Sequence, residues 1–444
     1  MASRKRRSPA RLRVGKVSIY LHHGAWWRYY REHGKQVRRK VGEARDEAEQ
    51  VAAQVNAQLT QGAPTLVAFT PVAVPDLRLR FLDYHEQVLR SSVGTVRRYR
   101  AATQHLEDFV AQQARTPQAH EIRPDAFATH LRNIEVAPNG HKNAGKRRLR
   151  DKGVRFILET CRAMYNYAVK RWHLPPYVGN PFSELPLDRL KIEDAKPIFV
   201  FKADTELAFF KAASDWGFPI HFTLAKTGLR VGELTHLLIE DVDLEGSWLH
   251  VRNKTELGRR IKTGQERVVP LLPEVVAVLR AVIGRRRAGP VFLREKLVGT
   301  APRLVKTREE LQRVLQERVS KRRGEAEVLR RADVHLIARK VWWDAGAVKS
   351  DVVRSTFLRV MARLNRPEAT CPKSWRHSFA TLLQDANVDP LIRQQVMGHR
   401  PTNSTGLGMT ANYTHTRPET LRRQVEQALR RWPESLAYAK ERAG

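Results

Sequence analysis

The sequence predicts a multidomain protein that is mainly α-helical and carries small β elements. Its 444 residues are enough for two to four domains at roughly 100–200 residues each. Apolar residues recur at helical spacing over most of the chain and alternate with polar ones only in short stretches. The hydrophobic content of 42% is ordinary for globular domains, which argues against a charge-dominated disordered chain.

The composition is strongly basic, with 80 Lys and Arg against 46 Asp and Glu and a net charge of +34. This excess predicts a polyanionic partner such as nucleic acid. The two cysteines, Cys161 and Cys371, are too few for a disulfide framework or a thiolate metal cage. We therefore expect a cytoplasmic protein with no metal. No apolar run approaches the roughly 18 residues of a membrane span, so no membrane partner is expected.

The N-terminal part, residues 1–60, predicts a three-stranded sheet followed by a helix. Apolar and polar residues alternate over 17–21, 26–31 and 36–41, and a helical stripe follows over 44–59. The first 42 residues hold 13 Lys or Arg and one acid. Such a sheet can lay a β-ribbon into a DNA groove. The alternative is that its aromatic residues Trp27 and Tyr29 only form a small core.

Two linkers divide the rest of the chain. Residues 61–76 are rich in proline and almost uncharged, and residues 186–198 follow a cluster of prolines. Between them, residues 77–185 read as a helical domain with a basic loop at 138–152. Residues 199–444 form the expected third domain, which mixes helices with short strands.

The third domain is expected to contain a long helix over 220–238 and strands over 248–252 and 266–271. Thr307 and Glu310 have the spacing of a capping box at the start of a charged helix.

Basic and hydroxyl side chains gather in three patches of this domain and in the hairpin between them. In the first patch Arg230 precedes Glu233 by three residues, so the carboxylate can orient the guanidinium. The second patch spans 371–381 and continues to a Gly-His pair, and the third is Tyr-Thr-His at 413–415. The candidate site residues are Arg230, Lys262, Lys373, Arg376, His399 and Tyr413.

The order Arg, Lys, Lys-x-x-Arg, Gly-His, Tyr resembles the signature of the tyrosine recombinase, or phage integrase, family. The resemblance covers about residues 199–432. Residues 1–60 and 77–185 resemble the arm-type DNA-binding domain and the helical, SAM-like core-binding domain of the longer integrases. The resemblance implies a site-specific recombinase that integrates and excises a mobile element without a metal or other cofactor.

The resemblance also assigns the site residues. Arg230 and Arg376 would neutralise the non-bridging phosphate oxygens in the transition state. Tyr413 would be the nucleophile, and its 3′-phosphotyrosine ester would conserve the bond energy for resealing. Lys262 would protonate the departing 5′-hydroxyl, although Lys254 is close enough in sequence to be the hairpin lysine instead.

His399 would hydrogen-bond the phosphate, and Lys373 would support proton transfer or the phosphate. Lys373 departs from most relatives, which have histidine there, and a lysine acts as a base near neutral pH only with a lowered pKa. The segment 284–370 is longer than a minimal catalytic domain requires, and its role stays open.

By resemblance, the expected partners are double-stranded DNA at core and arm sites, three further copies in a tetramer on a Holliday junction, and accessory DNA-bending proteins. A nucleoid-associated protein of prokaryotic or phage origin is expected. The helix over 417–432 would dock on a neighbouring protomer or, alternatively, on its own domain.

Three rival functions fit parts of this pattern. A type IB topoisomerase or a telomere resolvase would use the same residues on another DNA topology. A catalytically silent DNA-binding regulator would retain the domains, but it would not need all of the catalytic residues together.

Overall fold

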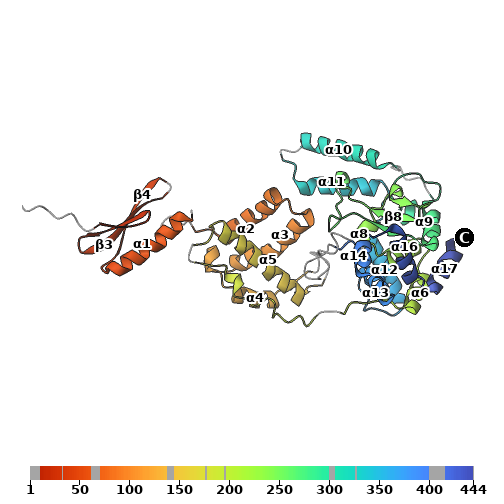
Figure 1. Cartoon of the computed structure of the whole chain (residues 1–444), viewed down its shortest axis with the longest axis horizontal. Helices are drawn as coiled ribbons and strands as arrows, with labels where there is room; N and C mark the ends of the chain where they lie inside the picture. Colours follow the sequence, from red (N-terminus) through yellow and green to blue (C-terminus); the bar gives the residue numbers. More distant parts are fainter. Residues whose placement is uncertain are drawn as a thin grey trace, which may run out of the picture. The chain divides into compact units, whose positions relative to one another are not determined.

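The computed structural model describes residues 11–32, 34–61, 71–137, 145–175, 178–194, 197–299, 306–325, 328–399 and 416–443 (Figure 1). The chain divides into two compact units, residues 1–195 and 196–444. Helices predominate in both, and the strands of the described residues form three small antiparallel sheets. The predicted fold class is confirmed. Among the described residues no helix is long and apolar enough to cross a membrane.

The first sheet has four strands where the sequence predicted three. The strands are consecutive and antiparallel: β1 (Arg11–Val14), β2 (Val17–His22), β3 (Ala25–Glu32) and β4 (Lys35–Gly42). The missed strand is β1. Its Arg-Leu-Arg-Val alternation has the period of a strand, but its two arginines follow a run of basic residues in the sequence, and the predicted strands begin only at residue 17.

Helix α1 (Arg45–Thr60) covers one face of this sheet (Figure 1). Trp26 and Tyr30 pack against it and are 8% and 1% exposed. Because successive strand residues point to opposite faces, Trp27 and Tyr29 lie on the face away from α1. The alternative in which Trp27 and Tyr29 form the core is therefore wrong.

The rest of the first unit is a small helical domain with its own core. Its helices are α2 (Val74–Asp83), α3 (Val93–Ala111), α4 (Pro124–Asn133) and α5 (Asp151–Lys170). A short π-helical turn, η1 (Tyr84–Val88), extends α2, and β5 (Glu135–Val136) pairs with β6 (Arg147–Arg148). Helix α5 is buried along one stripe, where the Tyr165 hydroxyl donates to the carbonyl of Ala119 at 2.9 Å.

The second unit packs helices around a core centred on Trp375, which is fully buried and stacks on Phe201 with ring centroids 3.7 Å apart. Its helices are α6 (Ala203–Ala212), α7 (Gly217–Thr227), α8 (Val231–Leu234), α9 (Pro273–Ile283), α10 (Arg308–Glu325), α11 (Arg331–Asp344), α12 (Ser350–Arg363), α13 (Lys373–Asp385), α14 (Pro390–Met397), α16 (Pro418–Leu429) and α17 (Pro433–Ala443). Its sheet contains β7 (Val242–Asp243), β8 (Trp248–Val251) and β9 (Arg267–Pro270), in that order.

The helix predicted over 220–238 is broken in the structure into α7 and α8. Gly228 ends α7 with φ +61°, in the left-handed region that favours glycine. A Cβ at Gly228 would lie 2.4 Å from Cδ1 of Phe379, so the close approach of α13 also requires glycine. The break makes Arg230 the N-cap residue directly before α8 instead of a residue inside a long helix.

Helix α16 packs into the core of its own unit. Its apolar side chains are buried there: Leu421, Val425, Ala428 and Leu429. The expectation that this helix docks on a neighbouring protomer is not met, and the alternative of docking on its own domain is what the structure shows.

Candidate active site

Two arginines from different elements share one buried carboxylate. Nη1 of Arg230, at the start of α8, donates to Oε1 of Glu233 at 2.9 Å. Nη2 of Arg267, on β9, donates to Oε2 of Glu233 at 2.7 Å. The pairing of Arg230 with Glu233 confirms the prediction from their spacing. Arg267 was missed, although strand alternation places it on the same buried face as Val269.

Arg376 enters the cluster from α13 and is held by main-chain carbonyls at the ends of two helices. Its Nη1 donates to the carbonyl of Gly228 at 2.6 Å, and its Nη2 donates to the carbonyl of Met397. The same Nη2 lies 3.3 Å from Nε2 of His399. The break after α7 and the end of α14 thus fix the direction of this guanidinium.

The cluster carries more positive than negative charge. Burial, together with Arg230 and Arg267, lowers the pKa of Arg376 to about 9, so its guanidinium is charged at neutral pH. Burial alone would raise the pKa of Glu233, but the hydrogen bond and charge of Arg267 outweigh it and lower the pKa to about 2. Three guanidiniums and one carboxylate leave a net charge of +2, which favours an anion at this place.

His399 follows Gly398, the left-handed residue that ends α14. Burial and the three arginines lower the pKa of His399, so the imidazole is neutral at neutral pH. A guanidinium can only donate hydrogen bonds. Nε2 of His399 therefore accepts from Arg376, which leaves the ring proton on Nδ1 as a donor.

The two candidate hairpin lysines have different surroundings. Lys254 is 3% exposed, and its Nζ donates to Oδ2 of Asp241 at 2.8 Å. Lys262 is exposed in the turn between β8 and β9. Lys373 is exposed in the first turn of α13, three residues before Arg376. Lys262 and Lys373 are thus accessible to a ligand, whereas the ammonium group of Lys254 is already paired with Asp241.

The structure brings together Arg230, Arg376 and His399, whereas Tyr413 lies outside the described residues. His399 and Thr416, which flank the segment containing Tyr413, both line one cavity of about 480 Å³. Arg267 lines the same cavity. Within the described ranges, no group of three or more His, Cys, Asp or Glu side chains is arranged to hold a metal.

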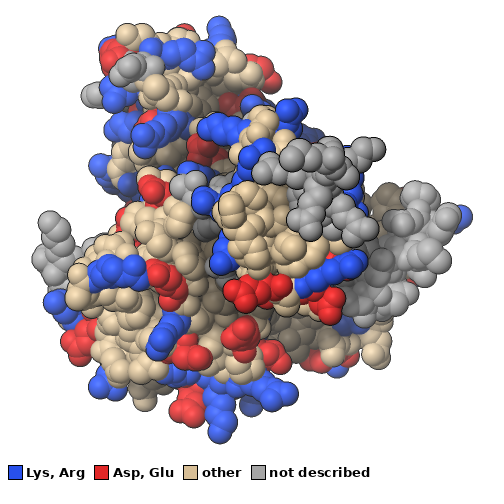
Figure 2. Space-filling model, turned by 90° about the vertical axis from the view of Figure 1, so that its left-hand side faces the viewer, with Lys and Arg blue, Asp and Glu red and all other residues tan. Residues whose placement is uncertain are grey.

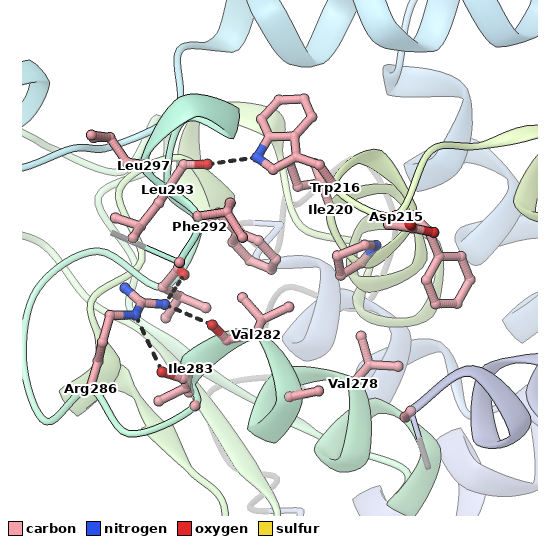
Figure 3. Close-up of a pocket in the computed structure, with 18 of the residues that line it drawn as sticks. Asp215, Trp216, Ile220, Val278, Val282, Ile283, Arg286, Phe292, Leu293 and Leu297 are labelled. Carbon is pink, nitrogen blue, oxygen red and sulfur yellow. Dashed lines mark hydrogen bonds between the residues drawn. The ribbon is translucent and has the colours of Figure 1, made fainter. Parts of the chain in front are cut away.

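A second cavity of the same unit, of about 700 Å³, lies between the start of α7, the end of α9 and the end of α17 (Figure 3). Its walls are mainly apolar. Arg286 is directed at main-chain carbonyls there, with its Nη2 donating to Val291 at 2.7 Å (Figure 3). None of the six predicted site residues lines this cavity, so it offers little to a phosphate group.

Basic side chains also occur far from the arginine cluster. Figure 2 shows Lys and Arg spread over the face in view, with Asp and Glu among them. Exposed charges of this kind attract nucleic acid without distinguishing one phosphate from another. The buried cluster is therefore the candidate for chemistry.

A helical domain that gathers three arginines and a histidine around a net-positive centre, with an exposed lysine in the turn between β8 and β9, has the arrangement expected of a tyrosine recombinase. Residues 220–420 match the model of the phage integrase family. This part of the chain is a phage integrase domain, and the chain is a site-specific recombinase, as its sequence predicted.

Similar proteins include tyrosine recombinase XerA of Saccharolobus solfataricus, 23% identical over 76% of this chain and 87% of the relative. The transposase from transposon Tn916 of Enterococcus faecalis is 25% identical over 53% of this chain and 51% of the relative. A solved structure of the Tn1549 transposon integrase with transposon right end DNA aligns with 81% of this chain and 100% of that chain. Its TM-score of 0.52 at 18% identity supports the fold.

Proposed function

We propose that this recombinase cuts and rejoins DNA through a 3′-phosphotyrosine on Tyr413, as an integrase of a mobile element. The observation that carries the proposal is the cluster of Arg230, Arg267, Arg376 and Glu233, with its net charge of +2. A phosphodiester carries one negative charge, and a second develops as the nucleophile attacks. The cluster therefore matches the transition state better than the ground state.

Contacts within the protein already orient the guanidinium groups of Arg230 and Arg376 for this task. Glu233 orients Arg230, and the carbonyls of Gly228 and Met397 orient Arg376. Arg376 uses three of its five N–H donors within the described structure, which leaves two for the non-bridging oxygens. Such preorganised donors need little rearrangement when charge develops.

Tyr413 is the proposed nucleophile. Its hydroxyl attacks the phosphorus, the bond to the 5′-oxygen breaks, and the tyrosine becomes joined to the 3′-phosphate. The reverse attack by a 5′-hydroxyl from the second duplex reseals the strand and releases the tyrosine. Tyr413 lies three positions before Thr416 in the sequence. Thr416 lines the same cavity as His399 and Arg267, and this nearness in sequence supports the assignment.

Lys262 is the proposed proton donor to the leaving 5′-oxygen. Its exposure in the hairpin turn supports this role, and the buried ion pair of Lys254 with Asp241 argues against the alternative. His399, with its proton on Nδ1, donates to a phosphate oxygen. Lys373, one turn before Arg376, supports the phosphate or the proton transfer.

The proposed arm-site surface is the face of the N-terminal sheet that α1 does not cover, here called the open face. Tyr20 pairs with Trp27, and Tyr29 lies between Arg11 and Arg38, whose guanidiniums are 5.7 and 5.5 Å from its ring. Cations interleaved with aromatic rings on a sheet suit a DNA groove. In this proposal residues 1–60 bind arm sites, and residues 77–185 close around the core site with residues 199–444.

Strand exchange would pass through a Holliday junction held by four copies of the chain, with accessory DNA-bending proteins. The names of the Tn916 and Tn1549 relatives support a mobile element as the source of the DNA. This function places the protein on the nucleoid in the cytoplasm.

A nicked suicide site tests the proposal, because the broken strand cannot be resealed and the covalent complex accumulates. We expect an SDS-resistant complex with the wild type and none with Tyr413→Phe, which should bind the DNA equally well. A wild type that binds without forming the complex would indicate a silent regulator. A complex on any DNA, without site preference, would favour a topoisomerase, and hairpin ends in the products would favour a telomere resolvase.

A further inference from the structure

We propose that the helical hairpin of α10 and α11 positions the turn that carries Lys262, with Arg308 and Trp342 as the positioning residues. The inference rests on the proposed function, in which Lys262 protonates the leaving oxygen. It gives the long segment between α9 and α12 a role in the reaction. A general acid acts only within hydrogen-bond reach of the reacting oxygen, so its backbone must be held in place.

The hairpin has an apolar core that includes the segment leading to Lys262. The capping box predicted at the start of α10 is confirmed. The main-chain N–H of Thr307 donates to Oε2 of Glu310 at 2.9 Å, and the main-chain N–H of Glu310 donates to Oγ1 of Thr307 at 3.3 Å. The buried side chains of this cluster come from both helices and from two loops of the catalytic core: Leu238, Leu257, Leu311, Leu315, Ala338, Val341, Trp342, Ala345 and Ala347. The hairpin therefore packs on the loop between β8 and β9.

Polar contacts fix the hairpin to the same loop. Nε1 of the buried Trp342 donates to the carbonyl of Leu257 at 3.1 Å. Nε of Arg308 donates to Oε1 of Glu256 at 2.6 Å. At Gly258, with φ +68°, a Cβ would lie 2.6 Å from Cβ of Ala338, so the approach of α11 requires a glycine there.

Asn253 connects these contacts to the lysine turn. Its carbonyl accepts from Nη2 of Arg308 at 3.1 Å. Its side chain accepts from the main-chain N–H of Ile261 and donates to the carbonyl of Gly264, both at 2.9 Å. Lys262 lies between these two anchor points. One path from α10 to the backbone around Lys262 thus runs through Asn253.

Lys254, next to Asn253, fixes the first half of the loop as well. Lys254 N–H donates to the carbonyl of Arg259 at 2.9 Å, and its side chain is locked to Asp241. The loop from 253 to 264 is therefore held on several sides, while the side chain of Lys262 stays exposed. A rigid backbone that carries an exposed side chain suits a proton donor that reaches its substrate only when DNA is bound.

The test compares two suicide sites that differ in one atom, the bridging 5′-oxygen or a 5′-sulfur. A thiolate leaves without a proton because a thiol is far more acidic than an alcohol, so the sulfur site bypasses the general acid. We expect Trp342→Phe and Arg308→Ala to slow covalent-complex formation on the oxygen site by roughly 10- to 100-fold, as for a misplaced catalytic group. On the sulfur site both variants should match the wild type.

Three variants serve as references. Lys262→Ala should show the same pattern with a larger loss on the oxygen site, roughly 10²- to 10⁴-fold. Arg376→Ala should be slow on both sites. Arg313→Ala, on the exposed side of α10, should resemble the wild type on both. Trp342→Phe keeps the buried ring, so it remains informative if Arg308→Ala fails to fold.

Equal losses on the oxygen and sulfur sites would overturn the inference, because the hairpin would then support folding or DNA binding without acting through Lys262. Wild-type rates in both variants on the oxygen site would overturn it too. Failure of the proposed function is distinguishable, since the wild type itself would then form no covalent complex on either site.

Discussion

Two basic regions of the molecule, the arginine cluster of the catalytic unit and the open face of the N-terminal sheet, use the same side chains in opposite ways. Arg376 is 6% exposed and is already bound to two carbonyls and a histidine. Arg11 and Arg38 are exposed and flank the ring of Tyr29. Burying a charge is costly unless it is compensated. In the proposed function, the cluster binds one specific negative charge and the sheet face binds many phosphates.

The largest expected effect comes from removing one arginine of the cluster. Arg376→Ala should slow covalent-complex formation at least 10²- to 10³-fold, roughly the loss seen when a preorganised transition-state donor is removed. Affinity for core-site DNA should change only a few-fold, because many exposed cations share the binding. Single-turnover cleavage and binding titrations check both numbers. Arg354→Ala, an exposed arginine on α12, is the matched control. A cleavage rate within tenfold of the wild type would contradict the role of Arg376.

A smaller effect is expected from Glu233→Gln, which should lower the stability of the folded protein. The pKa of Glu233 is lowered to about 2 from an ordinary value of 4.5. The carboxylate therefore stabilises the folded unit by about 3 kcal/mol above pH 5. Removing its charge also leaves Arg267 buried without its partner. The melting temperature at pH 7 should fall by roughly 6–12 °C.

The pH dependence of the folding stability gives a second test of the charge on Glu233. A depressed acid pKa gives stability that is present above about pH 4.5 and is lost as the pH falls toward 2. The wild type should therefore approach the stability of Glu233→Gln over that range in thermal or urea unfolding. A difference between the two proteins that stays constant from pH 7 to pH 3 would show that Glu233 is not held as a carboxylate by the arginines.

The smallest effect is expected at the open face of the N-terminal sheet, where substitutions should change the salt dependence of binding to arm-site DNA. The double variant Arg11→Ala, Arg38→Ala should reduce the slope of log K against log salt for arm-site DNA by about 2, at about 0.9 per lost phosphate contact. Cleavage of an isolated core site should not change. Arg45→Ala, on α1 at the opposite face, is the control. If Arg45→Ala lowers the slope as much as the double variant does, the face has been assigned wrongly.

Local features of this structure could be predicted from the sequence because neighbours in sequence create them. Arg230 meets Glu233 one helical turn later, and Thr307 meets Glu310 in a capping box. Strand alternation predicted three strands of the first sheet. The remaining strand, β1, was missed because its two arginines resemble the basic residues that precede it in the sequence.

Contacts between distant segments could not be predicted in the same way. Arg267 reaches Glu233 from 34 residues away, and Arg308 reaches the carbonyl of Asn253 from 55. A Cβ at position 228 would meet the ring of Phe379, which only the folded core brings near. The role of Tyr413 rests on its place in the sequence and stays a prediction.

The most direct measurement is to identify the residue that becomes joined to DNA. The covalent complex from a nicked suicide site is digested with trypsin and nuclease, and the nucleotide-bearing peptide is sequenced by mass spectrometry. Trypsin cleaves poorly before proline, so the fragment covering residues 394–422 contains one tyrosine, Tyr413. The account predicts a 3′-linked nucleotide on that tyrosine in the wild type and, after the same reaction time, a far lower yield in Arg376→Ala. A nucleotide on any other residue, or an undiminished yield in Arg376→Ala, would contradict it.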